Sequence, residues 1–205
     1  MQKKGYVFFV RHGQTDWNLK KLIQGRDEVP LNETGLSQAE WVANSFYTAC
    51  KKTGIKFDKV VSSPLGRASV TAKAIADKIG CSDFSHDVRL IERDFGEQSG
   101  KEYDFGSPFI VGNDETIKGL ESIEDVLARM QGFIKETATS GKYIIAVSHG
   151  SAAAVLTKNT KKRYENTRET VLRNCHMVVF SYDGEEILVE GYDVSPENLD
   201  ELELQ

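Results

Sequence analysis

The hydrophobic positions along the chain fall into two patterns, namely short continuous runs and longer segments with an apolar residue every three or four positions. Three short segments predict strands, at residues 6–10, 59–62 and 143–147, and the continuous apolar run at 6–10 is typical of a strand buried on both faces of a sheet. Four segments with helical periodicity predict helices that each bury one face, at residues 36–50, 64–79, 123–134 and 151–157. Two last runs, at 177–182 and 186–190, flank Asp183-Gly184, which favours a hairpin turn.

Polar residues mark the expected starts of three of these helices. Asn32 or Thr34 can cap the first helix, and Ser63 stands before a proline at the expected first position of the second. Ser122 and Asp125 have the spacing of a capping box ahead of the third. The segments between the buried runs are therefore expected to be helical.

The alternation of these elements predicts an α/β fold of three layers. A mainly parallel central sheet should carry helices on both faces, with an antiparallel edge strand from the final hairpin. The sequence has no internal repeat and no linker-like change of composition, so residues 1–205 are expected to form one domain. The acidic stretch at 196–205 is expected to fray.

Composition and charge exclude several classes of protein. The chain has 205 residues, of which 40% are apolar and 28% charged, as in ordinary globular proteins. Its net charge of −5 argues against a nucleic-acid or anionic-membrane partner, because both need a basic face. No apolar stretch approaches the roughly 20 residues that span a bilayer, and residues 1–10 do not resemble a secretory signal. We therefore expect a cytoplasmic protein.

The three cysteines give no sign of a disulfide framework or a metal centre. Cys50, Cys81 and Cys175 lie far apart in the sequence and form no C-x-x-C pair. Buried or unreactive thiols are the expected alternative. We predict no metal site.

Charged and imidazole side chains follow each of the three buried runs. Arg11 and His12 follow the first run, Arg67 follows the second, and His149 follows the third. Ligands of such sheets bind beyond the carboxyl ends of the strands, where these residues would meet. Two guanidiniums and two imidazoles make a cationic pocket suited to a small dianion such as a phosphoryl group. The alternative is that each side chain is merely solvated or hydrogen-bonded locally.

The motifs around these residues resemble the histidine phosphatase superfamily, which includes the cofactor-dependent phosphoglycerate mutases. The opening motif is Arg11-His12-Gly13-Gln14-Thr15, followed by Asp16-Trp17-Asn18. Further motifs follow in family order, at Leu22–Asp27, Pro30-Leu31, Thr34–Leu36, Ser62–Ala68, Ile91–Gly96, Glu121-Ser122 and Ser148–Gly150. Together they cover residues 6–157 and imply a phosphoglycerate mutase-like fold.

The resemblance implies five catalytic residues and neither metal nor cofactor. His12 would attack phosphorus and form a phosphohistidine, which a neutral imidazole can do at physiological pH. Arg11, Arg67 and His149 would hold the phosphoryl oxygens and offset the charge of the transition state. Glu92 would protonate the leaving oxygen and then accept a proton from the attacking water.

Further residues take their expected roles from the same motifs. Glu92 has an alternative interpretation as an ordinary ion-pair partner of Arg89 or Arg93. Five residues are expected to bind substrate, namely Asn18, Thr15, Gln24, Gly25 and Gly150. Four residues are expected to be structural or exposed rather than functional, namely His86, His176, Trp17 and Trp41.

The chain departs from the family pattern after Gly96. Many phosphatases of the family have a Trp-acid-Gly step there, whereas this chain has Glu97-Gln98-Ser99-Gly100. Residues 97–119 are expected to form a short cap, smaller than the insertion that covers the pocket in phosphoglycerate mutases. Contacts to the leaving group are expected from Tyr103, Phe105, Phe109 and Ile110.

A short cap leaves a pocket open to water, which favours hydrolysis over return of the phosphoryl group to a second hydroxyl. We therefore predict a phosphatase that acts on small-molecule phosphomonoesters. A phosphoglycerate mutase is the first alternative, and a non-catalytic phosphate-binding protein is the second. The oligomeric state stays open, with a homodimer as one alternative.

Overall fold

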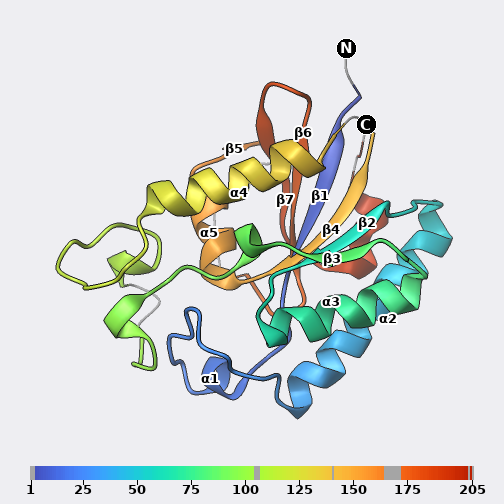
Figure 1. The fold of residues 1–205 in the computed structure, drawn as a ribbon. Coiled ribbons are helices and arrows are strands. Elements are labelled where there is room, and N and C mark those ends of the chain that lie inside the picture. Colours follow the sequence, from blue (N-terminus) through green and yellow to red (C-terminus); the bar gives the residue numbers. More distant parts are fainter. Residues whose placement is uncertain (1–2, 104–106, 140, 164–171, 203, 205) are drawn as a thin grey trace.

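The computed structural model describes residues 3–103, 107–139, 141–163, 172–202 and 204. Its centre is a seven-stranded mixed sheet with the strand order β3-β2-β4-β1-β6-β7-β5 (Figure 1). The strands are β1 (Gly5–Arg11), β2 (Lys59–Ser62), β3 (Phe84–His86), β4 (Tyr143–Ser148), β5 (Lys161–Lys162), β6 (Met177–Tyr182) and β7 (Ile187–Val194). Adjacent strands from β3 to β1 are parallel, whereas β6 is antiparallel to both β1 and β7.

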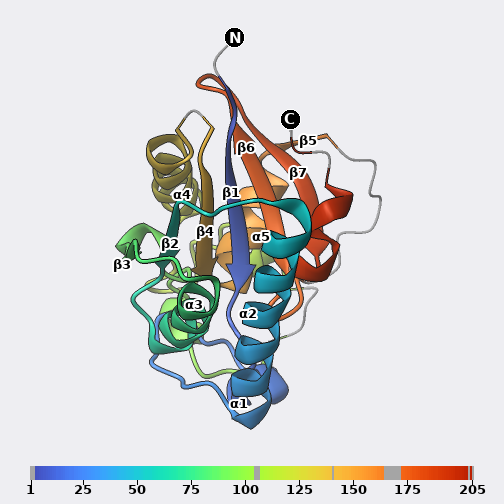
Figure 2. The same ribbon diagram turned by 90° about the vertical axis from the view of Figure 1, so that its right-hand side faces the viewer.

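Helices cover both faces of this sheet (Figures 1 and 2). The helices are α1 (Asp16–Leu19), α2 (Glu33–Thr53), α3 (Gly66–Ile79), α4 (Ile123–Thr137) and α5 (Gly150–Lys158). Short 3₁₀ turns lie at Val88–Leu90, Gly96–Gln98, Pro108–Ile110 and Pro196–Glu201. The predicted three-layer α/β arrangement with an antiparallel side is confirmed.

Strand β1 is buried on both faces, as its continuous apolar run predicts. Val7 and Phe9 belong to a core cluster with residues of α4 and α5. Tyr6, Phe8 and Val10 belong to a second cluster with residues of α2 and α3. Successive side chains of a strand point to opposite faces, so one apolar run supplies both cores. The chain emerging from β1 is therefore fixed between two packed layers.

Two of the predicted helix caps are present. Asn32 caps α2, because its side-chain oxygen accepts a hydrogen bond of 2.8 Å from the backbone N–H of Gly35. Ser122 caps α4, because its hydroxyl accepts a bond of 3.1 Å from the N–H of Asp125. The predicted hairpin is also present, since Asp183 lies in the turn between β6 and β7 and accepts bonds from the next turn residues.

The prediction that Ser63 caps α3 is wrong. The helix begins at Gly66, its N-cap is Leu65, and no side chain of the cap residue bonds to it. The N–H of Gly66 is satisfied instead by the Glu28 carboxylate, at 3.1 Å. Ser63 lies too early in the chain to cap this helix, and its hydroxyl contacts His149.

The acidic C-terminal stretch does not fray over residues 196–201. These residues form a 3₁₀ segment that packs against α2, and the Leu199 side chain is buried in the core. The Glu197 carboxylate accepts a hydrogen bond of 2.9 Å from the Trp41 indole. Lys52 forms an ion pair with Asp200. Apolar burial and these two contacts hold a segment whose composition alone suggested disorder.

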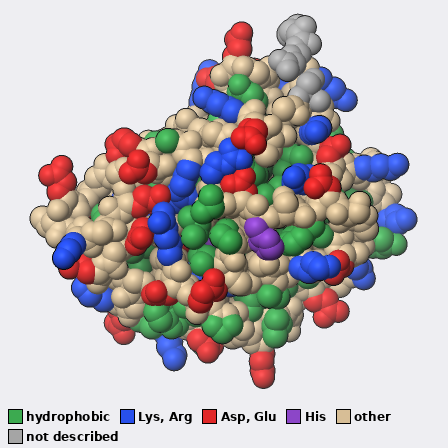
Figure 3. Space-filling model, viewed as in Figure 1, with side chains coloured by type: hydrophobic (Ala, Val, Ile, Leu, Met, Phe, Trp, Pro, Cys, Tyr) green, Lys and Arg blue, Asp and Glu red, His purple; other side chains and the backbone are tan. Residues whose placement is uncertain are grey.

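Acidic and basic side chains are interspersed over the face seen in Figure 3, and no broad patch of one sign covers it. Among the described residues, no helix combines the length and apolar character that crossing a bilayer requires. Within the same residues, no group of three or more His, Cys, Asp and Glu side chains is arranged to hold a metal ion.

Candidate active site

The carboxyl ends of β1 and β4 lie side by side and open onto one cavity. The two strands are parallel and in register, with Arg11 opposite Ser148, so the residues that follow them leave the sheet together. The β1 arrow points toward the end of the molecule where α1 lies (Figure 2). A cavity of about 290 Å³ lies there, and Arg11, His12, Arg67 and Glu92 contribute to its lining.

His12 is held with one ring nitrogen engaged and the other available. Its Nδ1 lies 2.6 Å from the carbonyl oxygen of Gly13, which can only accept a hydrogen bond. Nδ1 must therefore carry the proton, and Nε2 presents a lone pair. The ring is only 3% exposed although it lines the cavity. The His12 ring is thus fixed, with a free lone pair on Nε2.

The turn after His12 is fixed by one close backbone approach and two hydrogen bonds. A Cβ on Gly13 would lie 2.5 Å from the carbonyl oxygen of Gly35, so no other residue fits there. The N–H of Gly13 donates to the Thr71 hydroxyl at 3.2 Å, and the carbonyl of His12 accepts a bond of 2.8 Å from the Asn174 side chain. His12 is therefore held in place by α2, by α3 and by the segment before β6.

His149 lies beside His12 but is not among the residues of the described chain that line the cavity. The two ring centroids are 5.2 Å apart and the rings are inclined by 60°. The Nε2 of His149 lies 2.8 Å from the Ser63 hydroxyl, whereas its buried Nδ1 has no hydrogen-bond partner among the described residues. Ser63 follows β2, so the ends of β1, β2 and β4 meet at this pair of imidazoles.

The two guanidiniums are anchored by backbone carbonyls rather than by carboxylates. Arg67, which is fully buried, donates to the carbonyls of Asp27 and Gly25 at 2.6 and 2.8 Å. Arg11 donates to the carbonyl of Leu172 at 2.5 Å. In the described part of the chain the Nε atoms of both arginines lack a partner. Both groups keep their positive charge for an anionic ligand.

Burial lowers the pKa of the His12 imidazole well below its ordinary value, and the charges of Arg67 and Arg11 lower it further. The hydrogen bond with the Gly13 carbonyl opposes this shift. Burial, with Arg67 and His12, also lowers the pKa of His149 well below its ordinary value. Both rings are therefore neutral at physiological pH, and the permanent positive charge of the cavity comes from the arginines.

The Glu92 carboxylate accepts hydrogen bonds from backbone N–H groups at the N-terminus of α5. Its Oε1 accepts hydrogen bonds from the backbone N–H groups of Ala152 and Arg93, at 2.8 and 2.9 Å, and its Oε2 accepts one from Ser151 at 3.1 Å. The carboxyl is 7% exposed and lines the cavity. It forms no ion pair with Arg89 or Arg93, whose guanidiniums bind other groups.

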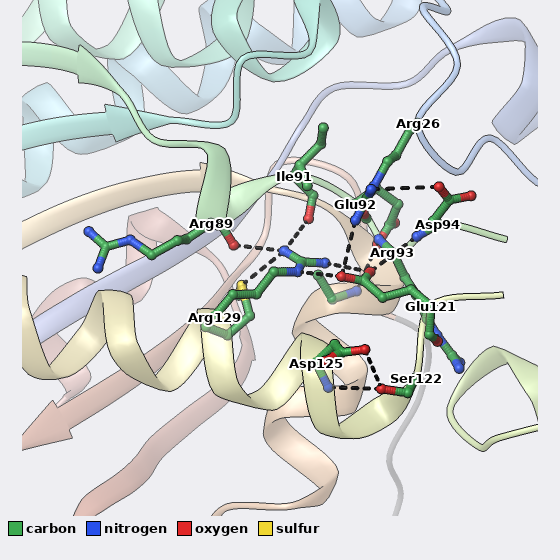
Figure 4. Close-up of polar contacts among 12 residues, drawn as sticks. Arg26, Arg89, Ile91, Glu92, Arg93, Asp94, Glu121, Ser122, Asp125 and Arg129 are labelled. Atoms are coloured by element: carbon green, nitrogen blue, oxygen red, sulfur yellow. Dashed lines mark hydrogen bonds and ion pairs between the residues drawn. The ribbon is translucent and has the colours of Figure 1, made fainter. Parts of the chain in front are cut away.

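The segment that carries Glu92 is braced by Arg129 of α4 (Figure 4). The Nη1 of Arg129 donates to the carbonyls of Arg89 and Ile91, each at 2.7 Å. The rest of its guanidinium binds both oxygens of Glu121, at 2.9 and 3.1 Å. One guanidinium therefore fixes the backbone immediately before Glu92, which preorganises the carboxyl.

A second arginine braces the other side of the same segment (Figure 4). Arg26 forms an ion pair of 3.0 Å with Glu121 and donates to the carbonyl of Glu92 at 3.4 Å. Glu121 in turn accepts a bond of 3.2 Å from the N–H of Asp94. Glu121 is thus shared by two arginines and joins the loop of Glu92 to the start of α4.

Comparison with known proteins decides the family. The family model of the histidine phosphatase superfamily (branch 1) matches residues 7–194. This chain belongs to that superfamily. The histidine, the two arginines and the glutamate described above all lie inside the matched region.

Named relatives of this chain include both mutases and phosphatases. A 2,3-bisphosphoglycerate-dependent phosphoglycerate mutase of Rhizobium etli is 35% identical over 177 residues, which are 77% of this chain and 82% of the relative. An uncharacterized phosphatase, PhoE, of Bacillus subtilis is 28% identical over 196 residues, which are 92% and 94% of the two chains. The family therefore indicates phosphoryl-transfer chemistry.

A solved structure shares the fold of this chain. The native structure of a mycobacterial glucosyl-3-phosphoglycerate phosphatase superposes with a TM-score of 0.74 and 23% sequence identity. The match covers 94% of this chain and all of that chain. The predicted phosphoglycerate mutase-like fold is confirmed.

The five residues expected to bind substrate fall into two groups. Asn18, Gln24, Gly25 and Gly150 contribute to the lining of the cavity. Thr15 is not among the lining residues of the described chain. It is fully buried and caps α1, with its hydroxyl accepting a bond of 3.1 Å from the N–H of Asn18. Thr15 therefore positions Asn18 rather than facing the cavity.

Gly25 needs its lack of a side chain for its backbone shape. Its φ is +49°, in the left-handed region that favours glycine, and its carbonyl points to Arg67 at 2.8 Å. The turn thus connects the guanidinium to the loop that also carries Gln24.

The cavity is also lined by residues that sequence reasoning missed. They are mainly apolar and come from widely separated segments, namely Leu22, Ile23, Phe95, Val111, Ala154, Leu172 and Tyr192, with Thr157 and Lys158 beside them. Helical spacing gave one usable sign, because Ser151, Ala154 and Lys158 lie at intervals of three and four along α5. The other segments meet only in the folded chain.

The residues expected near the leaving group are partly in place. Tyr103 and Ile110 line the cavity, and burial raises the pKa of the Tyr103 phenol. Phe109 packs edge-on against Phe95, with ring centroids 6.3 Å apart. Phe105 lies outside the described residues.

The remaining histidines and tryptophans lie outside the cavity lining, as expected. His86 bonds to the Ser69 hydroxyl at 2.8 Å. His176 stacks on Trp41, with ring centroids 5.9 Å apart. Trp17 packs beside Gly100, where a Cβ would lie 3.5 Å from its ring.

Proposed function

We propose that this protein is a phosphatase that hydrolyses small-molecule phosphomonoesters through a phosphohistidine on His12. The observation that carries the proposal is the geometry of His12. Its Nδ1 donates to the Gly13 carbonyl, which leaves the Nε2 lone pair for phosphorus in a cavity lined by Arg11 and Arg67.

In the first step, Nε2 of His12 forms a bond to phosphorus as the bond from phosphorus to the ester oxygen breaks. The arginines hold the equatorial oxygens, and the unpartnered Nδ1 of His149 supplies a further polar contact. The carboxyl of Glu92 gives its proton to the departing oxygen, so the product leaves as an alcohol.

In the second step, water attacks phosphorus and the bond from phosphorus to Nε2 breaks. The Glu92 carboxylate takes a proton from this water and returns to its starting form, while inorganic phosphate leaves. The Oε2 of Glu92 has a single backbone donor, Ser151, and keeps a lone pair for the transferred proton. The three backbone N–H groups and the Arg129 brace support this double role by fixing the carboxyl.

The charges in place support a mechanism without a metal ion. Two guanidiniums and the N-terminus of α5 together provide the positive potential that phosphoryl transfer needs. We propose that residues 97–119 form a short cap over the leaving group. Hydrolysis in an excess of chelator tests directly whether the reaction proceeds without a metal ion.

A phosphoglycerate mutase is the second candidate, because relatives at 35% identity carry that name. A mutase must hold an intermediate with two phosphoryl groups, which calls for a second cluster of cations next to the first. Beyond Arg11 and Arg67, the described lining adds a single cation, Lys158, at the far end of α5. The mainly apolar wall between them favours the phosphatase.

One experiment separates these candidates. The purified chain, with chelator present, is given 4-nitrophenyl phosphate in one assay and each monophosphoglycerate in another. We expect nitrophenol release, and phosphate release from monophosphoglycerates faster than their interconversion. Interconversion that outruns phosphate release would establish the mutase. Phosphate binding by calorimetry without turnover of any ester would establish a non-catalytic phosphate-binding protein.

A further inference from the structure

The C-terminal end of α5, which we call the far end of the cavity, contains a buried hydroxyl that differs from three other helical threonines. Thr53, Thr71 and Thr137 each donate to the carbonyl four residues earlier, at 2.7 to 2.9 Å. Thr157 of α5 is 1% exposed and lines the cavity, yet its Oγ1 has no hydrogen-bond partner among the described residues. A buried hydroxyl without a partner is costly unless a ligand satisfies it.

The residue after Thr157 is a lysine that also lines the cavity. Lys158, the last residue of α5, is exposed but contributes to the cavity lining, and it forms no ion pair within the described chain. It lies eight residues beyond Gly150, which at 1.5 Å per residue is about 12 Å along the helix axis. The helix thus has its phosphoryl-binding end at Gly150 and a cationic end at Lys158.

The wall between these two ends is apolar. Ala154 lies between them on the same face of α5, and the side chains of Leu22, Ile23, Phe95, Ile110, Val111 and Leu172 complete it. The only carboxylate in the described lining is Glu92, which belongs to the phosphoryl end. A positively charged group on the far part of a ligand would therefore meet Lys158 without an acidic partner.

We propose that the natural substrate is a phosphomonoester with an apolar, aromatic-sized body and a carboxylate, or another anion, at its far end, read by Thr157 and Lys158. The inference rests on the proposed function and specifies its substrate class. Three-carbon esters such as phosphoglycerate are too short to occupy both ends, because their carboxylate lies within a few bonds of phosphorus. The apolar body displaces water from the wall, and the distal anion accepts hydrogen bonds from the hydroxyl and the ammonium.

Binding of non-hydrolysable phosphonates tests this inference without depending on turnover. Two benzylphosphonates are used that differ only at the para position, where one has a propanoate chain and the other the corresponding propanamide. Each is titrated calorimetrically into the full chain. We expect the carboxylate to bind roughly three- to tenfold more tightly than the amide. We expect benzylphosphonate itself to bind at least about tenfold more tightly than methylphosphonate, because of the apolar wall.

Variants assign the preference to the two residues. Lys158→Met keeps the apolar stem and should reduce the ratio of carboxylate to amide affinity to about one. Thr157→Val replaces the hydroxyl by a methyl group and should weaken carboxylate binding about two- to fivefold. Lys135→Met is the matched control, because Lys135 is an exposed lysine in the last turn of α4, outside the lining. It should keep the full ratio.

Three results would overturn the inference, namely equal affinity of the wild type for the two para-substituted ligands, a ratio that survives Lys158→Met, or a ratio that falls equally in Lys135→Met. Turnover of 4-nitrophenyl phosphate is measured on the same preparation. Absence of turnover contradicts the proposed phosphatase, whereas the phosphonate ratios decide the substrate class independently.

Discussion

The two ends of the cavity are built in different ways. At the phosphoryl end, Arg67, His149 and Glu92 are each held by hydrogen bonds from neighbouring segments, and each is at most 7% exposed. The far end has a mainly apolar wall from widely separated segments, and Lys158 there is exposed. We expect the rigid polar groups to determine the chemistry and the shape of the far end to determine which leaving group is accepted. Mutations at the two ends should therefore have different signatures.

The largest effect is expected from removal of the nucleophile. His12→Ala should lower kcat for 4-nitrophenyl phosphate by on the order of 10⁴–10⁶-fold, because no other group replaces Nε2. His86→Ala is the control, since that ring lies outside the cavity lining, where it bonds to the Ser69 hydroxyl and packs edge-on against Phe84. Steady-state kinetics on both variants measures the difference. Substantial turnover by His12→Ala would contradict the proposal that His12 attacks phosphorus.

The next effect concerns the proton donor. Glu92→Gln should lower kcat by about 10²–10⁴-fold for an alkyl phosphate, whose leaving oxygen needs a proton. The loss should be smaller for 4-nitrophenyl phosphate, because nitrophenolate leaves without one. The comparison of the two substrates separates proton donation from simple loss of structure. Equal losses on both substrates would contradict the assigned role.

Removal of a positive charge at the phosphoryl end should have a somewhat smaller effect. Arg67→Ala should lower kcat/KM by about 10²–10³-fold if its guanidinium stabilises the transition state. Arg67→Lys keeps the charge but loses the planar fork that binds the Gly25 and Asp27 carbonyls, and should recover only part of the rate. Full activity in the lysine variant would mean that charge alone suffices.

At the far end, a change of volume should affect large substrates selectively. Ala154→Leu fills the wall between the two ends of α5, and should raise KM for 1-naphthyl phosphate by roughly tenfold. Competitive inhibition by inorganic phosphate should change little, because phosphate occupies only the other end. Equal weakening of both would show that the two ends are not separable.

The smallest effect is on stability. In the folded chain, the pKa values of His12 and His149 lie well below the ordinary 6.5. Below pH 6.5 these two histidines therefore bind protons in the unfolded chain but not in the folded chain. Stability is therefore lost as pH falls from 6.5, by at most about 1.4 kcal/mol per histidine and pH unit. Urea unfolding between about pH 6.5 and 5 should show a shallower decline in the double variant His12→Asn, His149→Asn. An unchanged slope would contradict the buried, neutral state of the rings.

The difference between the two ends of the cavity also explains which site residues could be predicted from the sequence. Arg11, His12 and His149 follow continuous apolar runs, so the parallel pairing of β1 and β4 brings them together by a general rule of α/β sheets. The role of Ser63 was misjudged, because its position before a proline is typical of a cap, whereas in the fold its hydroxyl contacts His149.

Other features could not be predicted because they depend on tertiary contacts. Helix α1 has four residues and exists through the mutual capping of Thr15 and Asn18. Strand β3 has three residues and exists through its pairing with β2. Leu172 and Tyr192 reach the cavity from segments without any local periodicity that points there. The order of the strands in the sheet determines where these two residues lie, and short-range sequence patterns do not predict that order.

The most direct test of the account is the identity of the phosphorylated residue. The chain is mixed with an aryl phosphate in the presence of chelator, quenched within the first turnover in alkali, digested and analysed by mass spectrometry. We expect an alkali-stable, acid-labile phosphoryl group on the peptide that contains His12, and its absence from His12→Ala. A phosphoryl group found on His149 instead, or formed only after divalent metal is added, would contradict the proposed mechanism.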